Sequence, residues 1–111
     1  MGERTPGTTV DLPRDWEAAR LATQLRAHLP MLQNRYHLQS VALFGSYVRN
    51  EQHAGSDLDV LVTFTHVPSL FDLAGLRNEL SDLLGVSVDV VTRSSLPPRI
   101  ARWVDREAVA L

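Results

Sequence analysis

Apolar residues recur every three or four positions between residues 14 and 34, and polar side chains occupy the positions between them. This spacing is typical of an amphipathic helix, whose apolar side covers a core. Pro30 lies late in the pattern. Because proline cannot donate the hydrogen bond of a helix interior, we expect the helix to end or bend there. The apolar positions are Ala18, Leu21, Ala22, Leu25, Leu29 and Leu32.

Three shorter apolar runs occupy residues 39–44, 58–64 and 86–91 and are typical of buried strands. A second helix is expected between the last two runs. Residues 69–72 read Ser-Leu-Phe-Asp, which matches the Ser-x-x-Asp pattern of a helix start, and Gly85 supplies the C-terminal stop.

The tail after Pro97-Pro98 has the pattern of a further short helix, with Ile100, Trp103 and Val104 on one side. Strands that alternate with helices predict an α/β or α+β fold, in which a small mixed sheet of three or four strands is flanked by helices.

The chain has 111 residues, a length that suits one domain. We expect a flexible lead over residues 1–12 and a single domain over residues 13–111. No run approaches the roughly 18 apolar residues of a membrane span. The first residues also lack the apolar segment of a secretory signal, so a cytoplasmic protein without a membrane partner is expected.

Charge and cysteine content narrow the function further. The net charge is −2, so the chain lacks the overall positive field that attracts nucleic acids, and no direct nucleic-acid binding is expected. There are no cysteines, which excludes disulfides, zinc sites built on thiolates and cysteine nucleophiles.

Three aspartates stand out in the predicted strands. Side chains alternate between the two faces of a strand, so Asp57 and Asp59 lie on the face opposite Leu58 and Val60. Asp89 lies in the middle of an otherwise apolar strand, where a lone carboxylate needs a cation, a partner or water. Together the three would form an oxygen-rich site suited to Mg²⁺ or Mn²⁺. The alternative is that Asp57 caps the strand entrance while the other two face solvent.

A Gly-Ser turn follows the first predicted strand. Gly45 allows the backbone to approach a ligand closely, and Ser46 offers a hydroxyl group and a candidate helix cap. Amides at a helix start bind anions, and Arg49, one turn further on, is placed to reach a phosphate. The alternative is an ordinary turn in which Ser46 only caps. A phosphate site next to a cation site would point to nucleotide chemistry.

These residues carry a family resemblance. Gly45-Ser46, ten residues and then Asp57-x-Asp59 resembles the signature of the DNA-polymerase-β-like nucleotidyltransferase superfamily, and Asp89 lies where that family places its third carboxylate. From about residue 35 onward the chain is similar to the minimal nucleotidyltransferases, the antitoxins of HEPN/MNT toxin–antitoxin pairs. It departs from them at Asn50, where many relatives have glycine.

The resemblance implies a role for each matching residue. Gly45 and Ser46 would contact the β- and γ-phosphates of a nucleoside triphosphate. Asp57 and Asp59 would be ligands of two divalent ions. Asp89 would be the third metal ligand and a candidate base for the attacking hydroxyl. The phosphate contact of Arg49 is expected from its position alone.

The resemblance also implies the reaction, which is transfer of AMP from ATP to a tyrosine of a HEPN ribonuclease toxin, with two Mg²⁺ or Mn²⁺ ions. Since the chain leaves no room for an acceptor-binding domain, we expect a hetero-oligomer in which the toxin supplies the acceptor. Two alternatives stay open at this stage. One is an antitoxin that neutralises its toxin by stoichiometric binding alone, and the other is a free-standing antibiotic nucleotidyltransferase.

Overall fold

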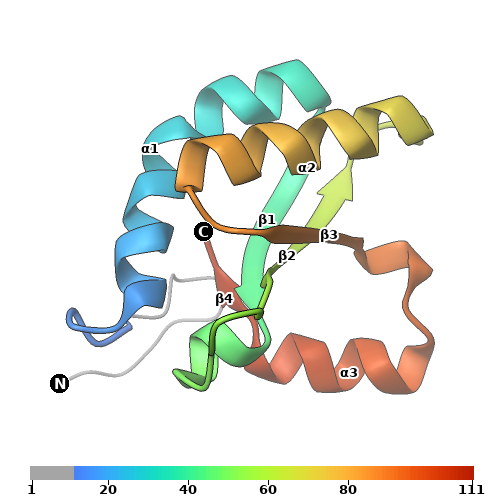
Figure 1. The fold of residues 1–111 in the computed structure, drawn as a ribbon. Helices are drawn as coiled ribbons and strands as arrows, with labels where there is room; N and C mark the ends of the chain where they lie inside the picture. Colours follow the sequence, from blue (N-terminus) through green and yellow to red (C-terminus); the bar gives the residue numbers. More distant parts are fainter. Residues whose placement is uncertain (1–11) are drawn as a thin grey trace, which may run out of the picture.

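The computed structural model describes residues 12–111. The lead predicted for residues 1–12 lies almost wholly outside these described residues and stays a prediction. Figure 1 shows the order of the elements. They are α1 (Glu17–Tyr36), β1 (Leu38–Phe44), the 3-10 helix η1 (Ser46–Arg49), β2 (Leu58–Phe64), α2 (Leu70–Leu84), β3 (Val88–Thr92), the 3-10 helix η2 (Arg93–Ser95), α3 (Pro98–Glu107) and β4 (Val109–Ala110).

The strands form one mixed sheet in the order β3-β2-β1-β4. β1 runs antiparallel to both β2 and β4, whereas β2 and β3 are parallel. Parallel neighbours need a crossover connection, and α2 supplies it. The predicted mixed sheet flanked by helices is therefore confirmed.

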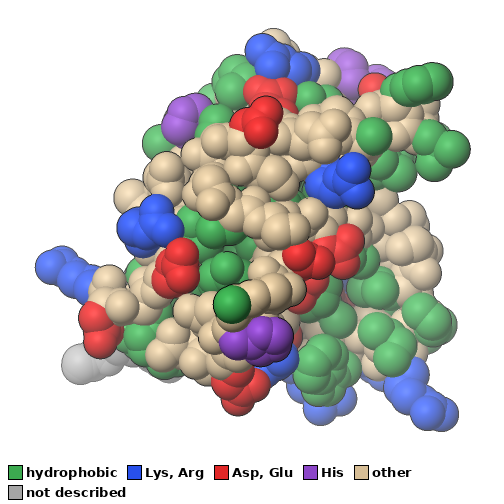
Figure 2. Space-filling model, in the orientation of Figure 1, with side chains coloured by type: hydrophobic (Ala, Val, Ile, Leu, Met, Phe, Trp, Pro, Cys, Tyr) green, Lys and Arg blue, Asp and Glu red, His purple; other side chains and the backbone are tan. Residues whose placement is uncertain are grey.

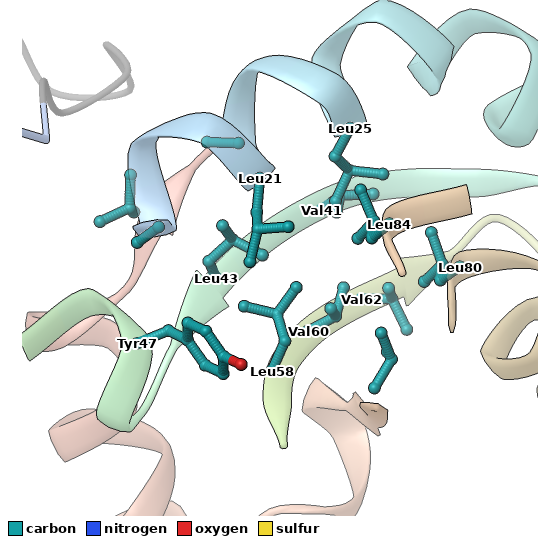
Figure 3. Close-up of a cluster of buried hydrophobic side chains, with 14 of the residues drawn as sticks. Leu21, Leu25, Val41, Leu43, Tyr47, Leu58, Val60, Val62, Leu80 and Leu84 are labelled. Carbon is teal, nitrogen blue, oxygen red and sulfur yellow. The ribbon is translucent and has the colours of Figure 1, made fainter. Parts of the chain in front are cut away.

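The core lies between the sheet and the pair α1 and α2, which cover the same face in Figure 1. Figure 3 shows the leucines of both helices pointing toward the valines and leucines of β1 and β2. The ring of Tyr47, from η1, closes one end of this cluster beside Leu58. The central members are Leu21, Leu25, Val41, Leu43, Leu58, Val60, Val62, Leu80 and Leu84.

Both long helices form in the regions where the sequence predicts them. Ser69 and Asp72 form a reciprocal capping box at the start of α2, and Gly85 ends the helix in the left-handed conformation, with φ of 72°. α1 continues through Pro30 to Tyr36, and Figure 1 shows that it bends. A bend is expected because proline cannot donate to the carbonyl four residues earlier.

α3 crosses the opposite side of the molecule from α1 and α2 (Figure 1). Its buried residues are Ala101 and Val104, whereas Ile100 and Trp103 are about half exposed. The helix therefore covers the other face of the sheet, where Leu61 is also buried. It leads into the two-residue strand β4, which was not predicted. No helix within residues 12–111 has the length and apolarity needed to cross a membrane.

Candidate active site

Asp59 and Asp89 are direct neighbours across the parallel pair of strands. The register sets Leu58 against Val88 and Asp59 against Asp89. Leu58 and Val88 are buried in the core, so alternation along the strands turns both carboxylates to the opposite face. Asp57 precedes β2 by one residue and is exposed. Figure 2 shows acidic side chains gathered over β3.

The Gly-Ser turn lies against these acids. Phe44, the last residue of β1, pairs with Asp59, so the turn leaves the sheet beside that carboxylate. Gly45 has a φ of 85°, and a Cβ placed on it would lie only 2.0 Å from Oδ2 of Asp59. Only glycine fits such a close approach. The structure thus places the turn directly beside Asp59.

Asp59 is the acid of the site with a clearly raised pKa. Burial raises its pKa, and the nearby carboxylates of Asp89, Asp57 and Glu107 raise it further, whereas Arg49 lowers it. The resulting pKa is about 6. The negative charges of three nearby carboxylates repel that of Asp59, and a bound cation would reduce this repulsion.

Glu107, the last residue of α3, is a part of the site that the sequence did not predict. Its Oε2 accepts a hydrogen bond from the Gly45 N–H at 2.6 Å, and its Oε1 accepts one from Nη1 of Arg49 at 2.5 Å. Its side chain is only 13% exposed. Nothing in the local pattern around residue 107 marks this contact, because it depends on how α3 crosses the sheet.

Arg49 is engaged by protein groups in this structure. Besides the bond to Glu107, its Nε donates to Glu51 at 3.1 Å, and its guanidinium lies 5.9 Å from the ring centre of Trp103. Its phosphate contact stays a prediction. Ser46 begins η1, but Gly45 holds the cap position and no side chain caps this helix. Ser46, a candidate for the helix cap in the sequence, therefore does not cap η1.

Asp89 also borders a hollow of about 250 Å³ beside α2, which Arg77 lines as well. A separate hollow of about 550 Å³ lies along the start of α1, and none of the predicted site residues lines it.

The donor chemistry of the site fits a divalent cation, since carboxylate oxygens are the ligands that Mg²⁺ and Mn²⁺ prefer. The raised pKa of Asp59, caused by burial and by the nearby carboxylates, agrees with such a site. Within residues 12–111, however, no three His, Cys, Asp or Glu side chains are gathered closely enough to hold a metal ion. The metal site therefore stays a prediction.

Comparison with known proteins identifies the family. The model of the nucleotidyltransferase domain matches residues 25–110, a segment that includes the turn and all three aspartates. The protein adenylyltransferase MntA of Thermococcus cleftensis is 45% identical over 85 residues, which cover 77% of this chain and 86% of that protein.

Solved structures agree with this assignment. One that is assigned as a minimal nucleotidyltransferase is 41% identical, with a TM-score of 0.67, and the match covers 82% of this chain and 95% of that one. A toxin–antitoxin complex with AMP-PNP contains a chain that is 26% identical, with a TM-score of 0.61 and coverage of 85% and 70%. The resemblance noted in the sequence is confirmed: the chain belongs to the nucleotidyltransferase domain family and is a minimal nucleotidyltransferase, an enzyme whose relatives are protein adenylyltransferases.

Proposed function

We propose that this protein is an antitoxin that transfers AMP from ATP to a partner toxin and thereby neutralises it. The observation that carries the proposal is the pairing of Asp59 with Asp89 directly beside the Gly45 turn. Further support comes from the adenylyltransferase activity named for the Thermococcus relative and from the related toxin–antitoxin complex with AMP-PNP.

The roles proposed for the residues follow from their positions. The turn at Gly45 and Ser46 receives the triphosphate of ATP next to Asp59, with Arg49 as a further candidate contact to it. Asp57, Asp59 and Asp89 are proposed to hold two Mg²⁺ ions, or Mn²⁺ in their place. When bound, such ions would neutralise charge on the phosphates and stabilise the displacement of pyrophosphate.

Asp89 is proposed to take the proton of the attacking hydroxyl as well. Its side chain is exposed on β3, so a group carried by another protein can reach it from solvent. A carboxylate within hydrogen-bond reach of a hydroxyl group can act as its general base. The bond formed joins the hydroxyl oxygen to the α-phosphorus, and pyrophosphate departs.

The acceptor that we propose is a tyrosine of a HEPN ribonuclease toxin, which is the partner that the resemblance to the minimal nucleotidyltransferases implies. A hetero-oligomer of the two proteins would bring this tyrosine to the exposed acids. The cytoplasmic location expected from the sequence stays a prediction.

The direct test is mass spectrometry of a candidate toxin after incubation with this protein, ATP and Mg²⁺. The expected result is a gain of one or more AMP groups on a tyrosine of the toxin, and no gain when ATP is left out. An unmodified toxin that nevertheless forms a stable complex with this protein would contradict the enzymatic proposal and favour an antitoxin that acts by binding.

A further inference from the structure

Glu107 joins the C-terminal helix to the turn at which the triphosphate is proposed to bind. The two oxygens of its carboxylate accept from the Gly45 N–H at 2.6 Å and from Nη1 of Arg49 at 2.5 Å. Gly45 lies just before η1 and Arg49 is its last residue. One carboxylate therefore holds both ends of this short helix.

The turn has few other tertiary hydrogen bonds in the described part of the chain. The amides of Val48, Asn50 and Glu51 donate to carbonyls within residues 45–47, so these bonds fix the shape of the turn and not its place on the sheet. Glu107 is 62 positions away from Gly45 along the chain. Its hydrogen bonds consequently tie the turn to a separate element, α3.

α3 holds Arg49 with a second residue as well. Trp103 lies one turn before Glu107, and the Arg49 guanidinium is 5.9 Å from its ring centre. A planar guanidinium suits both contacts, since it forms charge-assisted hydrogen bonds at its edge and stacks on aromatic rings with its face. Glu107 and Trp103 of α3 thus both contact Arg49.

The position of the turn sets how close a bound triphosphate would lie to Asp59. A Cβ on Gly45 would lie 2.0 Å from Oδ2 of Asp59, so the Gly45 backbone borders the space in front of that carboxylate. A small shift of the turn would change the distance between the proposed triphosphate position and the acids. Such a shift is costly because phosphoryl transfer depends on precise placement of the reacting groups.

We propose that Glu107 is a positioning residue, which sets the turn at the distance from Asp59 that ATP requires. The proposal rests on the function proposed above. It assigns Glu107 no contact with ATP, because both of its oxygens are used by the protein. Removing it is expected to weaken ATP binding, since the turn would lose its anchor to α3.

The test compares Glu107→Ala with Glu107→Gln, which keeps the size of the side chain and one acceptor for the Gly45 N–H. The control is Asp105→Ala on the same helix. It removes the same charge and breaks an ion pair with Arg93, whereas the hydrogen bonds to Gly45 and Arg49 come from Glu107 and stay in place. KM for ATP and kcat are measured for each protein, together with amide hydrogen exchange at Gly45.

For Glu107→Ala we expect a rise in KM for ATP of about tenfold or more, as for other supporting partners of active-site groups. Exchange at the Gly45 amide should become faster by a similar factor. Glu107→Gln should show a smaller rise in KM, and Asp105→Ala none. A purely structural role would lower the active fraction, and hence kcat, without changing KM. If Glu107→Ala does not fold, the smaller rise in Glu107→Gln decides the test.

Several results would overturn the proposal. A KM within about twofold of the wild-type value in Glu107→Ala would do so, as would an equal rise in Asp105→Ala. A lower KM would also do so, because it would mean that the Glu107 carboxylate competes with the triphosphate for Gly45 and Arg49. If the wild-type protein binds ATP but transfers no AMP, the proposed function fails alone. The Kd for ATP then replaces KM in the same comparison.

Discussion

Asp59 and Asp89 stand opposite each other in the register of two parallel strands, and both carboxylates face away from the core. Two acids at paired positions repel each other, and they are kept together here by the burial of Leu58 and Val88 one position earlier. The hydrophobic core therefore holds in place an arrangement that electrostatics alone would disfavour.

Asp59→Asn should abolish AMP transfer, with a rate loss of about a hundredfold or more, because the site would lose the central carboxylate proposed to hold the metal ions. Incorporation of AMP into the toxin measures the rate, and circular dichroism checks the fold. Asp82→Asn, on the exposed side of α2, is the control and should keep the wild-type rate. An Asp59→Asn protein with more than about a third of that rate would refute the assignment.

The same Asp59→Asn variant should fail to neutralise the toxin in cells. This expectation separates the enzyme from an antitoxin that acts only by binding, since the substitution removes one charge and leaves the exposed surfaces in place. Toxicity is read as colony formation when both proteins are expressed. Full protection by the variant would show that neutralisation does not need catalysis.

The Asp59 carboxyl should titrate with a pKa of about 6 when no divalent ion is bound. Burial is the main cause, and Asp89 is the largest of the contributing charges. Asp89→Asn should therefore lower the pKa of Asp59. The measurement is an NMR titration of side-chain carboxyl carbons in the presence of a chelator. An unchanged pKa in the variant would mean that the two carboxylates do not interact.

The raised pKa of Asp59 also predicts how stability depends on pH. Between its ordinary value of 3.8 and about 6, the folded protein binds a proton that the unfolded chain has already released. The contribution of this group to the free energy of unfolding is therefore full below pH 3.8 and is lost as the pH rises through 6. In chelator, Asp59→Asn should remove this loss and be more stable than the wild-type protein at pH 7. Denaturant unfolding of both proteins at pH 4 and pH 7, in the presence of a chelator, measures the free energy of unfolding.

Gly45→Ala should destabilise the protein by roughly 1–3 kcal/mol, because the residue has a φ of 85° and its Cβ would meet the Asp59 carboxylate. AMP transfer should be lost with it. Gly75→Ala is the matched control, since this glycine lies in α2 and its new methyl group would make only ordinary contact with Tyr36, 3.5 Å away. Urea unfolding should show Gly75→Ala as equal to or more stable than wild type, by up to about 1 kcal/mol. Equal destabilisation of both variants would argue against the close approach of Gly45 to Asp59.

Much of this fold could be predicted because its signals are local. The β2 run over residues 58–64 was predicted with the bounds that the structure has, and so was the capped start of α2 at Ser69. The Gly-Ser turn and the aspartates were found from their spacing, and the structure places the turn beside Asp59 and pairs Asp59 with Asp89. The contacts that were missed depend on distant parts of the chain. β4 has two residues, too few for a pattern, and forms because Val109 and Ala110 reach β1.

Local reasoning also erred at η1. Ser46 was a candidate cap for a helix that begins at this turn, but the structure forms one turn of 3-10 helix with Gly45 at the cap position. Asn50 ends this turn in the left-handed conformation, with φ of 58°, which asparagine tolerates better than most residues. This gives a physical reason why asparagine is accepted at a position that would also suit glycine.

The position of β3 at one end of the strand order has a consequence for solubility. An unpaired strand edge is a template on which other chains can add, and a charged side chain in its middle discourages such growth. Asp89 provides such a charge as the second residue of β3. Replacing the carboxylate proposed for catalysis is therefore expected to favour such growth, and preparations of an Asp89→Ala protein should be checked for filaments before any loss of activity is interpreted.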